Sequence, residues 1–269
     1  MARRKRSSAL RVGYAISVIG LWAGITHADA PPIVEPGGAA AVLNESIVFY
    51  ASFDHGRVDA DLALGRAEPL GVGGTLRFVE GRFGGGLLLG AGGGGARLEY
   101  AARDHLDFTR PGALSFWIRP RSWIPPSAER RGYVRFLTVP VHPASFVVQR
   151  MGFDRDLDRP ERLIVGVFGL PGVQPTYVEM SGSEGWRSDR WHLVVANWDR
   201  YGFEVSLDGQ PFERRAAADR LDYGALVEDG GAPVFVLGNN TEETTAIDEL
   251  TLYAHPLEMK DVAKLHGGR

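Results

Sequence analysis

The sequence contains no cysteine among its 269 residues. That absence excludes disulfide bonds, thiolate catalysis and cysteine-ligated zinc sites. A run long enough to span a bilayer is also missing, because residues 12–25 offer roughly 14 mostly apolar positions where a membrane helix needs about 20. A protein of this kind must be held together by its core, with or without a bound metal ion.

The first 30 residues have the pattern of a secretory signal peptide. Basic residues 3–6 precede the apolar run, and Ala28 and Ala30 supply the small side chains that suit signal-peptidase cleavage. We therefore expect residues 1–30 to be removed and the protein to be secreted, periplasmic or at the cell surface, without stable membrane insertion. The alternative, a retained anchor, is disfavoured by the short run. Residues 31–45 are rich in proline, glycine and alanine and are interpreted as a flexible leader before a domain at 46–269.

Basic charge is scarce once the signal is gone. Residues 1–30 hold five basic residues and one acidic residue, so the formal charge falls from −3 to about −7, with 25 basic against 32 acidic residues. A phosphate backbone requires a basic patch. The balance therefore argues against nucleic acid as a partner.

From residue 47 onward the sequence predicts strands. Short segments rich in β-branched and aromatic residues are bounded by glycine, proline or aspartate, and the 35 glycines are typical of tight turns. The expected strands are residues 47–53, 75–79, 96–100, 113–119, 133–139, 145–150, 162–168, 176–180, 192–198, 203–207, 234–237 and 247–253. This pattern predicts an all-β fold of two antiparallel sheets packed face to face.

Two local signals complete the fold prediction. Asp208-Gly209 predicts a hairpin with a type I′ turn, in which both central residues need positive φ. Residues 256–266 begin with a proline, carry apolar side chains on one face and precede Gly267, so they predict one short C-terminal helix.

Several motifs in this order resemble the bacterial laminin-G-like, or concanavalin A-like, jelly-roll domains. The resemblance spans residues 47–266. It rests on five segments: Phe53-Asp54, Gly81-Arg-Phe-Gly-Gly-Gly-Leu-Leu-Leu89, Leu114-Ser-Phe-Trp-Ile-Arg-Pro120, Trp191-His-Leu-Val194 with Leu207-Asp-Gly209, and Ile247-Asp-Glu-Leu-Thr-Leu-Tyr253. It implies a two-sheet antiparallel jelly-roll sandwich whose first and last strands meet.

The resemblance also implies a structural calcium ion where the chain ends meet. Asp54 and Asp248 are the positions that match, with Asp61 and Asn239 as weaker additional ligands. Calcium takes six to eight oxygen ligands, mostly carboxylates and carbonyls. The alternative is that Asp54 starts a turn and Asp248 is a solvated carboxylate at a strand edge.

The sequence contains no motif that indicates catalysis. Hydrolases of this fold place carboxylates two residues apart on one strand face, whereas Asp248 and Glu249 are adjacent and are expected to point to opposite faces. Glu204 and Asp208 share a face by parity, but Asp208 belongs to the hairpin turn. We therefore predict no catalytic residues.

Ligand recognition is expected to use aromatic residues in loops, whose ring faces cover the C–H surfaces of sugars. Trp123 and Tyr133 are the predicted ligand-binding residues, and Phe153 and Tyr201 also lie in or beside predicted loops. A packing role for Trp123 is the alternative. The sequence predicts an exported, non-catalytic module that binds a carbohydrate or an extracellular protein. The alternatives are a carbohydrate-active enzyme, either a glycoside hydrolase or a polysaccharide lyase, with an atypical site, and a purely structural cell-surface module.

Overall fold

A computed structural model of the protein describes residues 43, 45–90, 96–108, 110–123, 132–141, 144–152, 162–168, 176–180, 186, 189–216, 234–238 and 243–267. The chain divides into two compact units, residues 1–33 and residues 34–269, and every described residue belongs to the second. The predicted signal peptide and most of the predicted leader lie outside the described residues.

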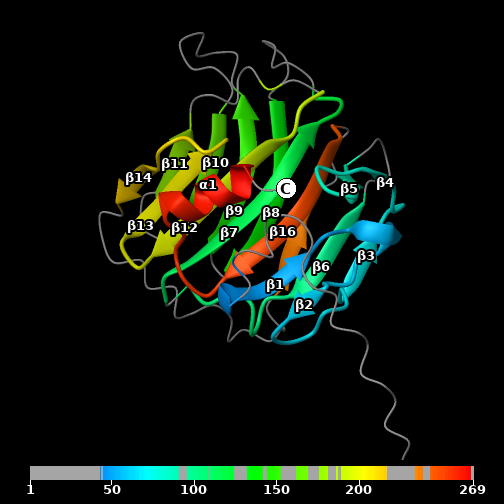
Figure 1. The fold of residues 1–269 in the computed structure, drawn as a ribbon, viewed down its shortest axis with the longest axis horizontal. Coiled ribbons are helices and arrows are strands. Elements are labelled where there is room, and N and C mark those ends of the chain that lie inside the picture. Colours follow the sequence, from blue (N-terminus) through cyan, green and yellow to red (C-terminus); the bar gives the residue numbers. More distant parts are fainter. Residues whose placement is uncertain are drawn as a thin grey trace, which may run out of the picture. The chain divides into compact units, whose positions relative to one another are not determined.

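The described residues form two antiparallel sheets, as predicted (Figure 1). The nine-stranded sheet follows the order β14-β13-β12-β7-β16-β1-β2, with β5 also pairing with β16 and β4 pairing with β5. Its strands are β1 (Ile47–Ala51), β2 (Leu62–Ala63), β4 (Phe78–Glu80), β5 (Gly85–Leu89), β7 (Gly112–Pro120), β12 (His192–Asp199), β13 (Gly202–Leu207), β14 (Glu213–Ala216) and β16 (Thr245–Tyr253). The first and last strands, β1 and β16, are paired neighbours.

The seven-stranded sheet follows the order β11-β10-β9-β8-β15-β6-β3. Its strands are β3 (Gly71–Gly73), β6 (Arg97–Ala101), β8 (Gly132–Val141), β9 (Ala144–Gly152), β10 (Arg162–Phe168), β11 (Thr176–Met180) and β15 (Val234–Leu237). The all-β, two-sheet class is therefore confirmed.

The main core lies between the two sheets, because alternate side chains of each strand point to it. Phe49 of β1 shows the contact, since its ring lies 5.1 Å from the rings of Tyr100 and Phe235 in the other sheet. Burial of this apolar layer is the main stabilising contribution to the fold.

A second apolar cluster lies on the outer face of the nine-stranded sheet, which is the face turned away from the main core. The single described α-helix, α1 (Met259–Gly267), packs there through Val262 and Leu265 against residues that include Trp117 and Leu193 (Figure 1). The predicted helix exists but begins later than residue 256. Among the described residues no helix is both long and apolar enough to cross a membrane.

The predicted Asp208-Gly209 turn is confirmed. Both residues have positive φ, 50° and 76°, and Gln210 N–H donates to the Leu207 carbonyl. These are the features of a type I′ turn.

Candidate functional site

The two aspartates predicted to hold calcium bind the same loop, residues 81–85. Asp248 of β16 accepts hydrogen bonds through Oδ2 from the backbone N–H groups of Arg82 (2.6 Å) and Phe83 (3.0 Å). Asp54, in the 3-10 helix η2 (Asp54–Gly56), accepts one through Oδ1 from Gly85 N–H. The structure therefore brings both residues together, with backbone donors between them.

Two glycines make this arrangement sterically feasible. Gly84 has φ of 61°, and a Cβ there would collide with the Asp54 carboxylate. A Cβ on Gly81 would collide with Asp248 Oδ2 and with the Gly85 backbone. The glycine-rich sequence of this loop is thus required by the close approach of the two carboxylates.

A β-bulge in β16 corrects the expectation that Asp248 and Glu249 point to opposite faces. Glu249 has φ of 56°, and the pairing register with β7 shifts between Asp248 and Thr251. Asp248 is paired with Trp117, and Glu249 accepts a hydrogen bond of 2.9 Å from Tyr50 Oη. Trp117 and Tyr50 both belong to the outer-face cluster. Simple alternation fails here because the extra residue of a bulge turns one side chain to the other face.

Burial raises the pKa values of the Asp248 and Glu249 carboxyl groups. Desolvation raises the pKa of Asp248 to about 7, although backbone hydrogen bonds from Phe83, Arg82 and Glu249 oppose the shift. Desolvation, followed by the charge of Asp248, raises the pKa of Glu249 to about 9. Glu249 Oε2 is buried without a hydrogen-bond partner. Glu249 is therefore a largely neutral, buried acid at neutral pH.

These contacts do not fit Asp248 as a calcium ligand. Its Oδ1 accepts the Glu249 N–H and its Oδ2 accepts two further N–H groups, so backbone donors occupy both carboxylate oxygens. Asp61 accepts bonds from Ser52 N–H and Oγ, at 2.9 and 2.7 Å, and Asn239 lies outside the described residues. Within the described ranges no three His, Cys, Asp or Glu side chains gather as a metal site. The calcium ion stays a prediction.

Trp123 is half-buried and packs against protein groups. Its Nε1 donates to Thr245 Oγ1 at 2.8 Å, and its ring stacks on Phe136 with a centroid distance of 5.8 Å. The Arg150 guanidinium lies 4.6 Å from the ring centroid, and Trp186 lies 6.0 Å away. These contacts favour a packing role for Trp123, which was the alternative to the predicted ligand-binding role.

Tyr133 is the second residue of β8 and is paired with Met151 of β9. Its side chain lies outside the described part of the structure, as does Phe153. The ligand roles of Trp123 and Tyr133 therefore stay predictions.

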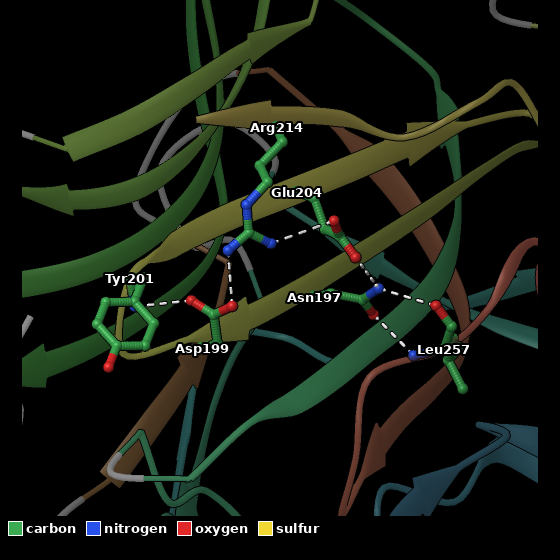
Figure 2. Close-up of polar contacts among 6 residues, drawn as sticks. All are labelled: Asn197, Asp199, Tyr201, Glu204, Arg214 and Leu257. Atoms are coloured by element: carbon green, nitrogen blue, oxygen red, sulfur yellow. Dashed lines mark hydrogen bonds and ion pairs between the residues drawn. The ribbon is translucent and has the colours of Figure 1, made fainter. Parts of the chain in front are cut away.

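A polar network on the edge of the nine-stranded sheet was not predicted as a unit. We call Asn197, Asp199, Tyr201, Glu204 and Arg214 the hairpin network (Figure 2). Arg214 of β14 donates to Asp199 Oδ2 at 2.6 Å and to Glu204 Oε2 at 3.3 Å, and Asn197 donates to Glu204 Oε1 at 2.8 Å. The hydrogen bond to Asp199 is the main cause of a raised Arg214 pKa. The backbone N–H of Tyr201 donates to Asp199 Oδ1 at 2.6 Å.

The sequence indicates part of this network, through the pairing expected across the β12–β13 hairpin, but not the position of Arg214. Asn197 and Asp199 alternate on β12, and Glu204 is directly opposite Asn197 across the tight β12–β13 turn. Arg214 enters only because β14 pairs Arg214 with Glu204. The four exposed residues of β14 lack the apolar alternation that predicts a strand, so that pairing could not be inferred.

Comparison with known proteins supports the fold. No family model matches the chain, and no curated protein matches it significantly. Domain 4 of AbnA, an extracellular GH43 arabinanase from Geobacillus stearothermophilus solved with arabinotriose, superposes with a TM-score of 0.57 at 15% identity, covering 82% of this chain and 98% of that domain. The binding domain of botulinum neurotoxin serotype D gives 0.61 at 12% identity, covering 83% of this chain and 52% of that one.

A third similar structure is the binding domain of botulinum neurotoxin DC in complex with SialylT. Its TM-score is 0.60 at 12% identity, with coverage of 84% of this chain and 52% of that domain. The chain thus spans about half the length of the toxin domains. At these identities the likeness shows the fold alone: a two-sheet β-sandwich of the kind found in these binding domains.

Proposed function

We propose that this protein is an exported, laminin-G-like (concanavalin A-like) recognition module that binds a carbohydrate through the hairpin network. Tyr201 carries the proposal: the residue is 59% exposed in the β12–β13 turn, its backbone N–H donates to Asp199 Oδ1, and Arg214 fixes the same carboxylate through Oδ2 (Figure 2). An exposed ring beside oriented polar groups is the chemistry that sugar recognition needs, because the ring covers C–H surfaces and the polar groups fix the hydroxyls. The shared fold with a domain solved with arabinotriose supports the proposal.

Glycan binding by the full-length protein tests this function. A glycan array with and without calcium would identify a ligand, and titration calorimetry would then compare wild type with Y201A and Y201F. We expect Y201A to weaken binding about fivefold to tenfold, since one ring contact contributes roughly 1–1.5 kcal/mol. Y201F keeps the ring and should bind within about threefold. The absence of any glycan signal, or unchanged binding by Y201A, would contradict the proposal.

The second candidate is a binding module whose ligand is a protein. The alternative that is not a binding module is a carbohydrate-active enzyme. Release of reducing ends from a polysaccharide panel would favour the enzyme. The carboxylates that share strand parity already have structural contacts: Glu204 binds Asn197 and Arg214, and Asp208 binds His192 at 2.8 Å and Leu193 N–H. These contacts favour binding over hydrolysis.

Export is part of this proposal, and the predicted calcium ion, which the contacts of Asp248 do not fit, has its own test. The N-terminal sequence of the secreted protein should begin near residue 31. Calcium bound only by the folded protein must raise its Tm, so a chelator that leaves the Tm unchanged would remove the calcium prediction.

A further inference from the structure

Two arginines stack on two tryptophans on the outer face of the nine-stranded sheet. The Arg119 Cζ lies 4.7 Å from the Trp191 ring centroid, and the Arg82 Cζ lies 4.8 Å from that of Trp117. Trp117 and Arg119 are two residues apart on β7, and Leu193 is opposite Trp117, which places Trp191 beside Arg119. Two residues along a strand span roughly 7 Å. The two stacks are therefore neighbours, and we call these four residues the arginine–tryptophan surface.

The guanidinium groups of this surface carry charge without a carboxylate partner among the residues described. Arg119 donates one hydrogen bond, from Nη2 to the Glu80 carbonyl at 2.8 Å, and its Nε is buried without a partner. Trp191 Nε1 is also buried without a partner. Arg82 is exposed, and its backbone N–H, not its guanidinium, contacts Asp248. Neither guanidinium therefore forms an ion pair with a described carboxylate, and the exposed Arg82 is the more accessible of the two.

The surrounding charges leave the surface basic. Burial, followed by the neighbouring charge of Arg121, lowers the pKa of Arg119, whereas Glu80 and Asp248 act in the opposite direction. Asp248 is fully buried and already accepts three backbone hydrogen bonds. The imidazole ring of His266 of α1 stacks on Trp117, with ring centroids 6.0 Å apart. The other two groups whose charge acts on Arg119, Arg121 and Glu80, are exposed and cancel each other in formal charge.

We propose that the arginine–tryptophan surface is a second binding site, which receives the carboxylate groups of an acidic polysaccharide. A guanidinium pairs with a carboxylate through two parallel hydrogen bonds, and stacking on tryptophan holds the guanidinium plane in one orientation. Two such groups on neighbouring stacks suit carboxylates repeated along a polymer better than one isolated anion. The site uses none of the residues of the hairpin network, so either site can fail alone.

Calorimetry with the full-length protein tests this site. The probes are a galacturonate hexamer, a neutral galactose hexamer of the same length, and inorganic sulfate. We expect the acidic hexamer to bind at least tenfold more tightly than the other two, with an affinity that falls as salt increases. Equal binding of the acidic and neutral hexamers overturns the proposal. So does sulfate binding as tightly as the acidic hexamer, since that result shows a simple anion site.

Matched variants locate the binding. R119Q should weaken binding of the acidic hexamer at least tenfold, and R119K, which keeps the charge but not the planar donor pair, should lie between R119Q and wild type. R215Q removes the same charge from the exposed strand β14, where Arg215 has no described ion pair, and should bind within twofold of wild type. An R119Q protein that melts like wild type yet binds like R215Q overturns the proposal, as does loss of acidic-hexamer binding in Y201A.

Discussion

At the scale of single residues, the buried acids of β16 decide how stability depends on pH. Glu249 has its pKa raised to about 9 by desolvation, and it is held by Tyr50 Oη and by an unusual backbone at φ of 56°. An acid whose pKa is higher in the folded than in the unfolded state favours folding while it is protonated. Its contribution is complete below the ordinary pKa near 4.5 and is lost as the pH rises toward 9.

E249Q therefore tests the direction of this linkage. The amide imitates the protonated acid, so the variant should be as stable as wild type near pH 4 and more stable at pH 8. Between the ordinary pKa near 4.5 and the raised pKa of about 9, each pH unit lowers the stability of the wild type by up to about 1.4 kcal/mol. Urea denaturation at both pH values measures the difference. E258Q, on an exposed side chain, should keep the wild-type slope. Lower stability of E249Q at pH 8 would mean that the ionised carboxylate stabilises the fold.

Alanine substitutions at Gly84 and Gly56 separate the free-energy cost of a steric collision from the cost of backbone strain. G84A places a methyl group against the Asp54 carboxylate at positive φ, whereas G56A, with φ of 70°, meets only Phe78 side-chain atoms at 3.7 and 3.8 Å. We expect G56A to cost about 1 kcal/mol from strain and G84A roughly 2–4 kcal/mol in total. Chemical denaturation of both variants measures the excess. Equal costs would show that the loop moves away from Asp54 without penalty.

At the scale of elements, one buried amide ties the segment that leads into α1 to strand β12, beside the apolar contacts of the helix itself. Asn197 Nδ2 donates to the Leu257 carbonyl at 2.9 Å, and its Oδ1 accepts the Leu257 N–H at 3.0 Å (Figure 2). The same Nδ2 group also donates to Glu204, which joins the start of the α1 segment to β13. Both backbone polar groups of the buried residue Leu257 are satisfied in this way, and losing such partners is costly.

N197A should therefore loosen α1 more than the rest of the protein. We expect a loss of roughly 2–3 kcal/mol, because two backbone groups of Leu257 become unsatisfied. Hydrogen exchange should accelerate most in α1. R214Q removes the outer part of the network without touching Leu257, so it is the matched control and should leave α1 protection unchanged. Uniform acceleration across both sheets in N197A would contradict a local role.

Particular elements show how far the sequence predicts this fold. β7 and β12 are long strands that are almost continuously buried, and the sequence placed each within one residue of its observed bounds. β2, β3 and β14 could not be predicted, because they are only two to four residues long and owe their conformation to pairing with a neighbour, and β3 and β14 are also largely exposed. The bulge at Glu249 was also missed, since positive φ at a glutamate has no local sequence signal. The same limit applies to Arg119 and Trp191, whose contact requires the register of β7 and β12.

At the scale of the whole domain, the two sheets share one core, and we expect them to unfold together. Phe49 contacts aromatic rings of the opposite sheet, and its side chain is fully buried. F49A should therefore lower stability by about 3–5 kcal/mol through lost burial and a cavity. Tryptophan fluorescence and far-UV circular dichroism should report the same reduced midpoint, because a single core gives a cooperative transition. V72A, on a side chain that is 51% exposed, should change stability by less than about 0.5 kcal/mol. Separate midpoints for the two probes in F49A would show that one sheet persists without the other, and the contacts between the sheets would then not be the main source of stability.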